Sequence, residues 1–135
     1  MADKSLLLEV VTPDRQVVST EVDIVVLPGV QGQFGVLVNH IPFLSALEIG
    51  EMYYRKGGQV DHIFLGGGFA EVTGDKVTVL VDSAERGKEI DLERAKRAKE
   101  RAEKRLAAGR TAEIDWARAE AALRRSIARM KVATR

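Results

Sequence analysis

The chain has 135 residues, 45% of them hydrophobic, and a formal net charge of +1, which allows one or two small domains with a modest core. It contains no cysteine, so a disulfide framework and thiolate chemistry are both excluded. No apolar run approaches the roughly 20 residues needed to cross a bilayer, and the N-terminus does not have the pattern of a signal peptide. These features predict a cytosolic protein without a direct membrane span.

The near-neutral total hides two halves of opposite charge. Residues 1–84 hold 5 lysines and arginines against 11 acidic residues, whereas residues 85–135 hold 16 against 9. Such an asymmetry predicts an anionic partner for the basic half. That partner could be the acidic half itself, another protein, a nucleotide or a nucleic acid.

The first 84 residues have the pattern of short strands separated by turns. Strands are predicted over residues 6–11, 16–18, 22–27, 50–55, 59–65, 69–73 and 76–80. Lys56-Gly57-Gly58 and Gly74-Asp75 are typical hairpin turns between the last four. Many short strands with turns close together predict a sandwich or barrel, not a parallel sheet. Residues 82–89 are predicted to be a linker.

The basic half contains two helical segments that begin with the same phrase, I-D-x-x-R-A, at Ile90 and at Ile114. Asp91 and Asp115 are each predicted to cap a helix N-terminus, because an aspartate side chain accepts hydrogen bonds from unpaired backbone N–H groups. Gly109 is well placed to end the first helix. Two capped helices with a short link that contains glycine predict an antiparallel hairpin.

Helical spacing arranges the hairpin's side chains in stripes. The first helix has one apolar stripe and the second has two, and an arginine row runs along each helix. The apolar stripes are Ala95, Ala98, Ala102 and Leu106; Trp116, Ala119, Leu123, Ile127 and Met130; and Ile114, Ala117, Ala121 and Ala128. The arginine rows are Arg94, Arg97, Arg101 and Arg105, and Arg118, Arg125 and Arg129. Because alanine buries little apolar surface, we expect a hairpin that docks weakly enough to be released. The alternative is a stable hairpin with a solvated arginine face.

Several motifs in close succession carry a resemblance to a known family. They are L-P-G at 27–29, G-Q-F-G-V-L at 32–37, H-I-P at 40–42, G-G-F-A-E-V at 67–72, V-T-V-L at 77–80, A-E at 84–85 and I-D-L-E-R-A at 90–95. In this order and spacing they resemble the epsilon subunit of bacterial F-type ATP synthase, called delta in mitochondria, over essentially the whole chain.

The resemblance implies an α+β chain: an N-terminal antiparallel β-sandwich over residues 1–84, then a C-terminal antiparallel two-helix hairpin over residues 85–135. It implies a non-catalytic rotor subunit of the central stalk in a proton-translocating enzyme. The sandwich would bind the gamma subunit and the c-ring. The hairpin would regulate the enzyme, extending along gamma toward the alpha and beta catalytic subunits to inhibit ATP hydrolysis. The implied location is the cytoplasmic face of the bacterial plasma membrane, where the subunit is peripheral.

The resemblance also implies a regulatory ATP site, although no cofactor is required. The matching positions are Glu85, Ile90, Asp91, Arg94, Ala95, Arg101, Arg125 and Arg129. The chemistry is suitable, because a helix N-terminus favours phosphate, arginine binds phosphate in a bidentate way, and Asp91 can accept from an adenine amino group. The alternative is that Asp91 only caps the helix, while the arginines are solvated or pair with glutamates of the sandwich. The second I-D-x-x-R-A phrase shows that capping alone can produce the pattern.

A second candidate surface is implied for the c-ring and gamma contact. Its residues are Gly32, Gln33, Phe34, Gly35, His40 and Pro42. They lie in the glycine-rich segment 29–42, predicted to be a loop that binds no phosphate because it lacks the P-loop and dinucleotide fingerprints. Gln33 stands where the family often has an acidic residue; because glutamine is uncharged, we expect hydrogen bonding but no ion pair with the c-ring at this position.

The two histidines, His40 and His62, have no cluster of metal-ligating or nucleophilic residues around them in the sequence. We therefore expect no metal site and no catalytic residue. Two other functions stay open from the residues: a free-standing nucleotide-sensing module, and a nucleic-acid-binding protein. Glutamates interleaved with the arginine rows argue against nucleic acid.

Overall fold

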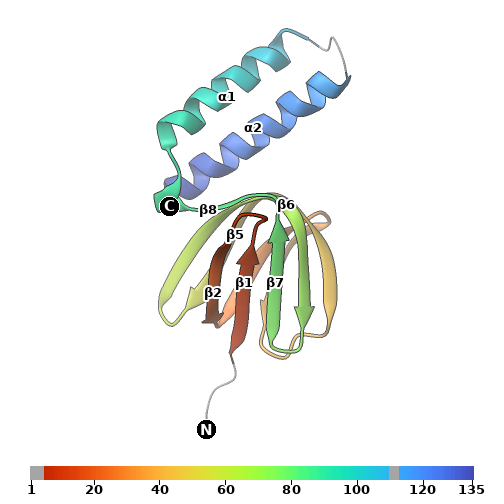
Figure 1. Ribbon diagram of the computed structural model, residues 1–135, viewed down its shortest axis with the longest axis vertical. Coiled ribbons are helices and arrows are strands. Elements are labelled where there is room, and N and C mark those ends of the chain that lie inside the picture. Colours follow the sequence, from red (N-terminus) through yellow and green to blue (C-terminus); the bar gives the residue numbers. More distant parts are fainter. Residues whose placement is uncertain (1–4, 110–112) are drawn as a thin grey trace.

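The structure, a computed structural model, describes residues 5–109 and 113–135, and of residues 113 and 114 the backbone alone. Figure 1 shows a β domain with two long helices lying across one end of it. The strands are β1 (Leu6–Val11), β2 (Gln16–Val22), β3 (Ile24–Gly29), β4 (Gly32–Leu37), β5 (Phe43–Lys56), β6 (Gln59–Thr73), β7 (Lys76–Val81) and β8 (Ala84–Arg86). A 3-10 turn, η1 (Gly87–Glu89), leads to α1 (Leu92–Ala107) and α2 (Glu113–Ala133). The predicted fold class is confirmed.

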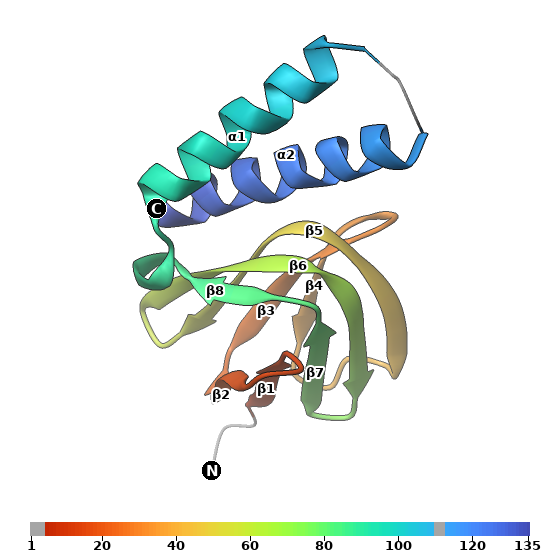
Figure 2. The same cartoon turned by 45° about the horizontal axis from the view of Figure 1, so that its top comes forward.

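The strands form one continuous path in the order β2-β1-β7-β6-β5-β3-β4, with β8 paired to β6. Every pairing is antiparallel except that of β1 with β7. The long strands β5 and β6 curve across the domain, so the sheet folds over on itself as a sandwich (Figure 2). Alternating side chains of the strands fill the space between the layers, with Leu8, Leu27, Met52, Ile63 and Val79 fully buried.

The structure differs from the predicted strands in several places: β2 runs on to Val22, β5 begins seven residues before the predicted start, and two glycine-rich segments are strands. The segment 29–42, expected as a loop, contains β4, which pairs with β3 and buries only Val36, so it lacks the usual alternation of a strand. The glycines at 66–68 do not interrupt β6. A Cβ atom at Gly68 would lie 2.1 Å from the Leu80 carbonyl oxygen, so glycine there lets β6 and β7 approach closely.

The predicted linker is also partly a strand, because β8 pairs with the middle of β6. Leu65, Phe64 and Ile63 face Ala84, Glu85 and Arg86 in register. The Arg86 guanidinium donates to the Tyr54 hydroxyl at 3.4 Å and to the Val17 carbonyl at 3.3 Å. The chain therefore remains attached to the sandwich up to residue 86.

Two truncations should measure the contribution of β8 to the β domain. We expect residues 1–84 to fold alone, and residues 1–87 to unfold at a temperature higher by about 5 °C. The strand's backbone hydrogen bonds are worth about 1 kcal/mol each, and 1 kcal/mol shifts the melting temperature of so small a domain by about 4–8 °C. Thermal unfolding followed by circular dichroism measures the difference. Equal melting temperatures would show that β8 depends on the helices for its pairing.

The first helix begins and ends as predicted, whereas the second does not. The Asp91 carboxylate accepts from the Arg94 backbone N–H at 3.1 Å, and Gly109 follows the helix with a φ of 96°. The expected cap at Asp115 is wrong, because α2 already begins at Glu113 and Asp115 lies inside its first turn.

Helix α2 lies between α1 and the sandwich (Figure 2) and packs on both. Its contact with the sheet is a small apolar cluster of Phe64, Ala128 and Val132, with Ile49 and Ile90 packed against it. The predicted stripes are only partly correct. Ile127 is 46% exposed and Ala117 is exposed, whereas Ser126 is buried at 1% exposure. The side chain of Ile114 is outside the described part of the chain.

Ion pairs join α2 and the residues just after it to the sandwich, mostly to acidic residues of the first half of the chain. Arg124 pairs with Glu48, and Arg129 Nε donates to Glu85 Oε1 at 2.6 Å. Arg135 makes two hydrogen bonds to Glu51, of 2.9 and 2.7 Å, while Lys131 Nζ lies 3.9 Å from the same carboxylate. The acidic half is therefore one anionic partner of the basic half.

Glu51 is the most buried acid of this contact, with 8% of its side chain exposed. Burial alone would raise its pKa, but the hydrogen bonds and charge of Arg135, with His62 and Lys131, outweigh burial and hold the pKa below its usual value. His62 Nδ1 lies 3.2 Å from Glu51 Oε2 on the sheet side. Glu51 is thus charged in the folded protein, and Arg135 and Lys131 pair with its carboxylate.

Candidate nucleotide-binding site

A cavity of about 430 Å³ lies where α1, α2 and the β8–η1 segment meet. All eight residues of the predicted nucleotide site line it: Glu85, Ile90, Asp91, Arg94, Ala95, Arg101, Arg125 and Arg129. The remaining lining residues are Glu89, Ala98, Ala122 and Ser126. Residues that are up to 44 positions apart, as Glu85 and Arg129 are, come together only because the helices fold back on each other and on the sheet.

The N-terminal turn of α1 forms one wall of the cavity. One carboxylate oxygen of Asp91, Oδ1, is already used to cap the helix. Capping and ligand binding are compatible at this residue, because a carboxylate has a second oxygen that can accept from a ligand. Ala95 is buried beside it, and its small side chain leaves space in the cavity. Ile90 connects this wall to the apolar cluster around Phe64.

The arginines of the two helices face the same cavity. Arg129 is neutralised by Glu85. In the described part of the chain no ion pair forms to the other three, Arg94, Arg101 and Arg125. Like charges in a shared cavity repel each other, and a polyanion between them would relieve that repulsion. The cavity is therefore electrostatically suited to a phosphate-bearing ligand.

The cavity has an acidic side that the sequence pattern missed in part. The Glu89 carboxylate accepts from the Arg86 backbone N–H at 2.9 Å and pairs with Arg15 at 2.9 Å. Those contacts, the backbone hydrogen bond first, hold the pKa of Glu89 below its usual value. The capping arrangement of η1 is the local signal that could have indicated Glu89. A ligand with both phosphates and a hydrogen-bond-donating base fits a cavity with cationic and anionic sides.

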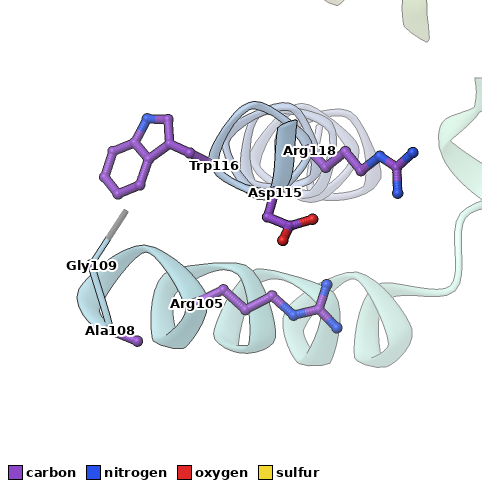
Figure 3. A pocket seen from close by; sticks show the side chains of 6 residues that line it. All are labelled: Arg105, Ala108, Gly109, Asp115, Trp116 and Arg118. Atoms are coloured by element: carbon purple, nitrogen blue, oxygen red, sulfur yellow. The ribbon is translucent and has the colours of Figure 1, made fainter. Parts of the chain in front are cut away.

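The second I-D-x-x-R-A phrase belongs to a different cavity, at the far end of the hairpin (Figure 3). That cavity, of about 460 Å³, is lined by Arg105, Ala108, Gly109, Asp115, Trp116 and Arg118. Asp115 points from α2 toward α1, where Arg105 lies, and Arg118 points away from both. The phrase alone therefore does not place residues in the first cavity. The Asp91 phrase lies there because α1 starts beside β8.

The predicted c-ring and gamma residues lie at β4 and the segment after it. Gly32, Gln33, Phe34 and Gly35 are in β4, whereas His40 and Pro42 precede β5. The Phe43 ring links the two groups, because its centroid is 5.2 Å from that of Phe34 and 6.0 Å from that of His40.

The neighbouring surface is apolar. Leu44 and Ile41 are 68% and 73% exposed, and Gln33 is exposed beside them. Exposed apolar clusters of this kind are typical of protein interfaces.

Two further properties concern the parts of the chain that the structure describes. Within residues 5–109 and 113–135, no group of three or more metal-ligating side chains could hold a metal ion. Over the same residues, neither helix is long and apolar enough to cross a membrane.

Comparison with known families covers nearly the whole chain. The family model for the ATP synthase delta/epsilon chain β-sandwich domain matches residues 5–87, and that for the long α-helix domain of the same chain matches residues 88–134. The ATP synthase epsilon chain of Nitratidesulfovibrio vulgaris strain DP4 is 58% identical over 130 residues, which are 96% of each chain. That of Syntrophobacter fumaroxidans is 53% identical over 133 residues, 98% of each chain.

Solved structures show the same fold. A chain of the Euglena gracilis mitochondrial ATP synthase superimposes with a TM-score of 0.84 at 24% identity, covering 98% of this chain and 83% of that one. A chain from the central stalk and c-ring of the Tetrahymena thermophila enzyme gives 0.58 at 12% identity, covering 98% and 95%. With sequence and fold in agreement along its length, this chain belongs to the family of ATP synthase epsilon chains, a non-catalytic subunit of that enzyme complex.

Proposed function

We propose that the protein is a rotor subunit in the central stalk of a proton-translocating F-type ATP synthase. The β domain, residues 1–84, binds the gamma subunit and the c-ring, with the apolar surface around β4 and Phe43 as part of the contact. Support comes from the exposure of that surface and from the Tetrahymena relative, whose structure is of a central stalk and c-ring. The complex lies at the cytoplasmic face of the bacterial plasma membrane.

The helical hairpin, residues 85–135, is the regulatory part of this proposal. It inhibits ATP hydrolysis when it leaves the sandwich and extends toward the alpha and beta subunits. The docked hairpin is held by a small apolar cluster and by ion pairs at the surface of the sheet. Contacts of this size are consistent with release at modest cost in free energy.

ATP binding in the cavity favours the docked hairpin. The observation that carries this proposal is the convergence of all eight predicted residues on one cavity that both helices and β8 build together. A ligand that needs all three elements binds the docked state better than the extended one, and it shifts the equilibrium by that difference in affinity. At a hundredfold excess over Kd the shift is at most about 2.7 kcal/mol.

Calorimetric titration with ATP tests the site on the full chain. We expect Arg94→Gln and Arg101→Gln each to weaken binding by about tenfold or more, since a hydrogen bond to a charged group is worth about 1.5–3 kcal/mol. Arg97→Gln is the matched control, because Arg97 is on the same helix, is exposed and does not line the cavity. Absence of heat at millimolar ATP, or an equal loss in the control, would reject the site.

The two other functions have weaker support. A free-standing nucleotide-sensing module does not account for the close similarity of the whole chain to epsilon chains. A nucleic-acid-binding role is disfavoured by the ion pairs that occupy Arg124, Arg129 and Arg135.

A further inference from the structure

We propose that Phe64 of β6 positions the Arg129 side chain for ligand binding, so that the sheet as well as the helices determines ligand affinity. The inference rests on the proposed function of the cavity. It concerns a residue outside the cavity lining, buried in the sandwich surface under α2.

The pairing of β6 with β8 builds a seat for one guanidinium group. Phe64 and Glu85 are direct neighbours across these strands. The Arg129 guanidinium lies over the Phe64 ring, 4.4 Å from its centroid, while Arg129 Nε donates to Glu85 Oε1 at 2.6 Å. The ring is fully buried, and a cation over a desolvated aromatic face is held more strongly than one at an exposed site. One contact fixes the plane of the guanidinium and the other fixes its direction.

This seat leaves the outer end of Arg129 available to a ligand. Its Nε is used by Glu85, and the two terminal nitrogens make no hydrogen bond to any residue that the structure describes. Arg129 lines the cavity, so its two terminal nitrogens can bind a phosphate there in a bidentate way. A side chain already fixed in the binding geometry loses less conformational entropy when the ligand arrives. Without the ring the guanidinium would rotate about its remaining contact with Glu85.

The same ring connects the cavity with docking. Phe64 belongs to the apolar cluster with Ala128 and Val132 on α2, and Ile90, which lines the cavity, packs against that cluster. The residue that orients Arg129 is therefore also the residue on which α2 docks. Ligand affinity should depend on Phe64 through Arg129, and not only through the general stability of the docked hairpin.

A double-mutant cycle on the full chain tests this route. We expect Phe64→Leu to weaken ATP binding by about fivefold, consistent with the loss of a partly desolvated cation–π contact. In an Arg129→Gln background, Phe64→Leu should cause only the small loss that comes from weaker docking of α2, because the side chain that it positions is gone. In an Arg94→Gln background the full fivefold loss should remain, since Arg94 does not touch the ring. Calorimetry with ATP and with inorganic triphosphate measures all variants, and Phe64→Met is the second ringless variant if the leucine variant melts early.

A loss of equal size in both backgrounds would overturn the proposal, because Phe64 would then act only by stabilising the docked hairpin. The ligand-free protein supplies an independent readout. The Arg129 Nε–H signal in NMR should be shifted by the aromatic ring and should move toward the ordinary arginine position in Phe64→Leu. An unshifted signal in the wild type would also overturn the proposal. If the wild type bound neither probe while the signal behaved as expected, the nucleotide site would fail and the seat would remain, with no ligand to position.

Discussion

Replacing Glu51 with glutamine should release α2 from the sheet, whereas replacing Glu48 with glutamine should leave it docked. Both glutamates are on β5; Glu48 pairs with Arg124 of α2, and Glu51 pairs with Arg135, two residues after α2, so the variants are closely matched. They differ in burial: 8% of the Glu51 side chain is exposed, compared with 37% for Glu48. A glutamine at 51 has one acceptor oxygen instead of two, so it would lose one of the two hydrogen bonds from Arg135 and leave Lys131 and Arg135 without the charge of the carboxylate. An exposed pair such as that of Glu48 contributes little.

The size of the effect can be measured because the chain has no cysteine of its own. Spin labels on single cysteines at the exposed positions Lys104 of α1 and Asp75 of the β6–β7 turn report the distance between hairpin and sandwich. We expect the docked-to-undocked ratio to fall by about tenfold in Glu51→Gln, as for the loss of one charge-assisted hydrogen bond, and by less than about twofold in Glu48→Gln. An equal response of the two variants would show that the burial of Glu51 does not strengthen the docking of α2 on the sheet.

Acid should release α2 in the wild type by the same route. The pKa of Glu51 is lowered in the folded protein, so its contribution to docking is complete above the usual glutamate pKa near 4.5 and is lost as the pH falls through the lowered value. Lys131 of α2, Arg135 just after α2 and His62 of β6 face this carboxylate. Glu51→Gln should remove this pH dependence. A midpoint of release near pH 6–7 would assign the transition to a histidine instead.

The sequence predicted the elements whose signal is local. The caps at Asp91 and Gly109 and the turns at 56–58 and 74–75 depend on a few neighbouring residues, and the structure contains each of them. The strands β4 and β8 were missed, because their existence depends on pairing with β3 and β6 and not on their own alternation. Helix α2 was placed correctly, but its buried side was not, because many alanines make several faces look equally apolar.

The candidate site shows the same limit. Its eight residues came from a resemblance, and the structure brings them to one cavity. Glu89 and Phe64 were not found, although both contact residues of that set or its surroundings. Phe64 reads as an ordinary core residue in the sequence; its contact with Arg129 exists only because the β6–β8 register places it beside Glu85. The Phe64–Arg129 contact joins residues that are 65 positions apart, so no pattern of neighbouring residues in the sequence could predict it.

Removing the hairpin should increase ATP hydrolysis by the assembled synthase. In a complex that carries residues 1–87 in place of the full chain, we expect an increase of about fivefold or more, the lower end of typical coupling between sites in allosteric proteins. The expectation follows from the proposed inhibitory role of the extended hairpin, whose arginine rows would meet acidic surfaces of the catalytic head. Hydrolysis is measured at equal occupancy of the subunit, checked by gel densitometry of the purified complex. Unchanged hydrolysis at full occupancy would contradict an inhibitory role.

The Glu51→Gln variant makes this prediction sharper, because it should act in the opposite direction. Truncation removes the inhibitor and raises hydrolysis, whereas release of an intact hairpin from the sheet supplies more inhibitor and lowers it. A defect in assembly or in binding to gamma would change both variants in the same direction. Saturating ATP should restore part of the hydrolysis lost in Glu51→Gln, because a ligand that binds the docked hairpin opposes release. Opposite changes in hydrolysis for the two variants, with ATP restoring activity to Glu51→Gln, would show one docking equilibrium. That equilibrium would then depend on both the cavity and the Glu51 ion pairs, and it would set the rate of hydrolysis.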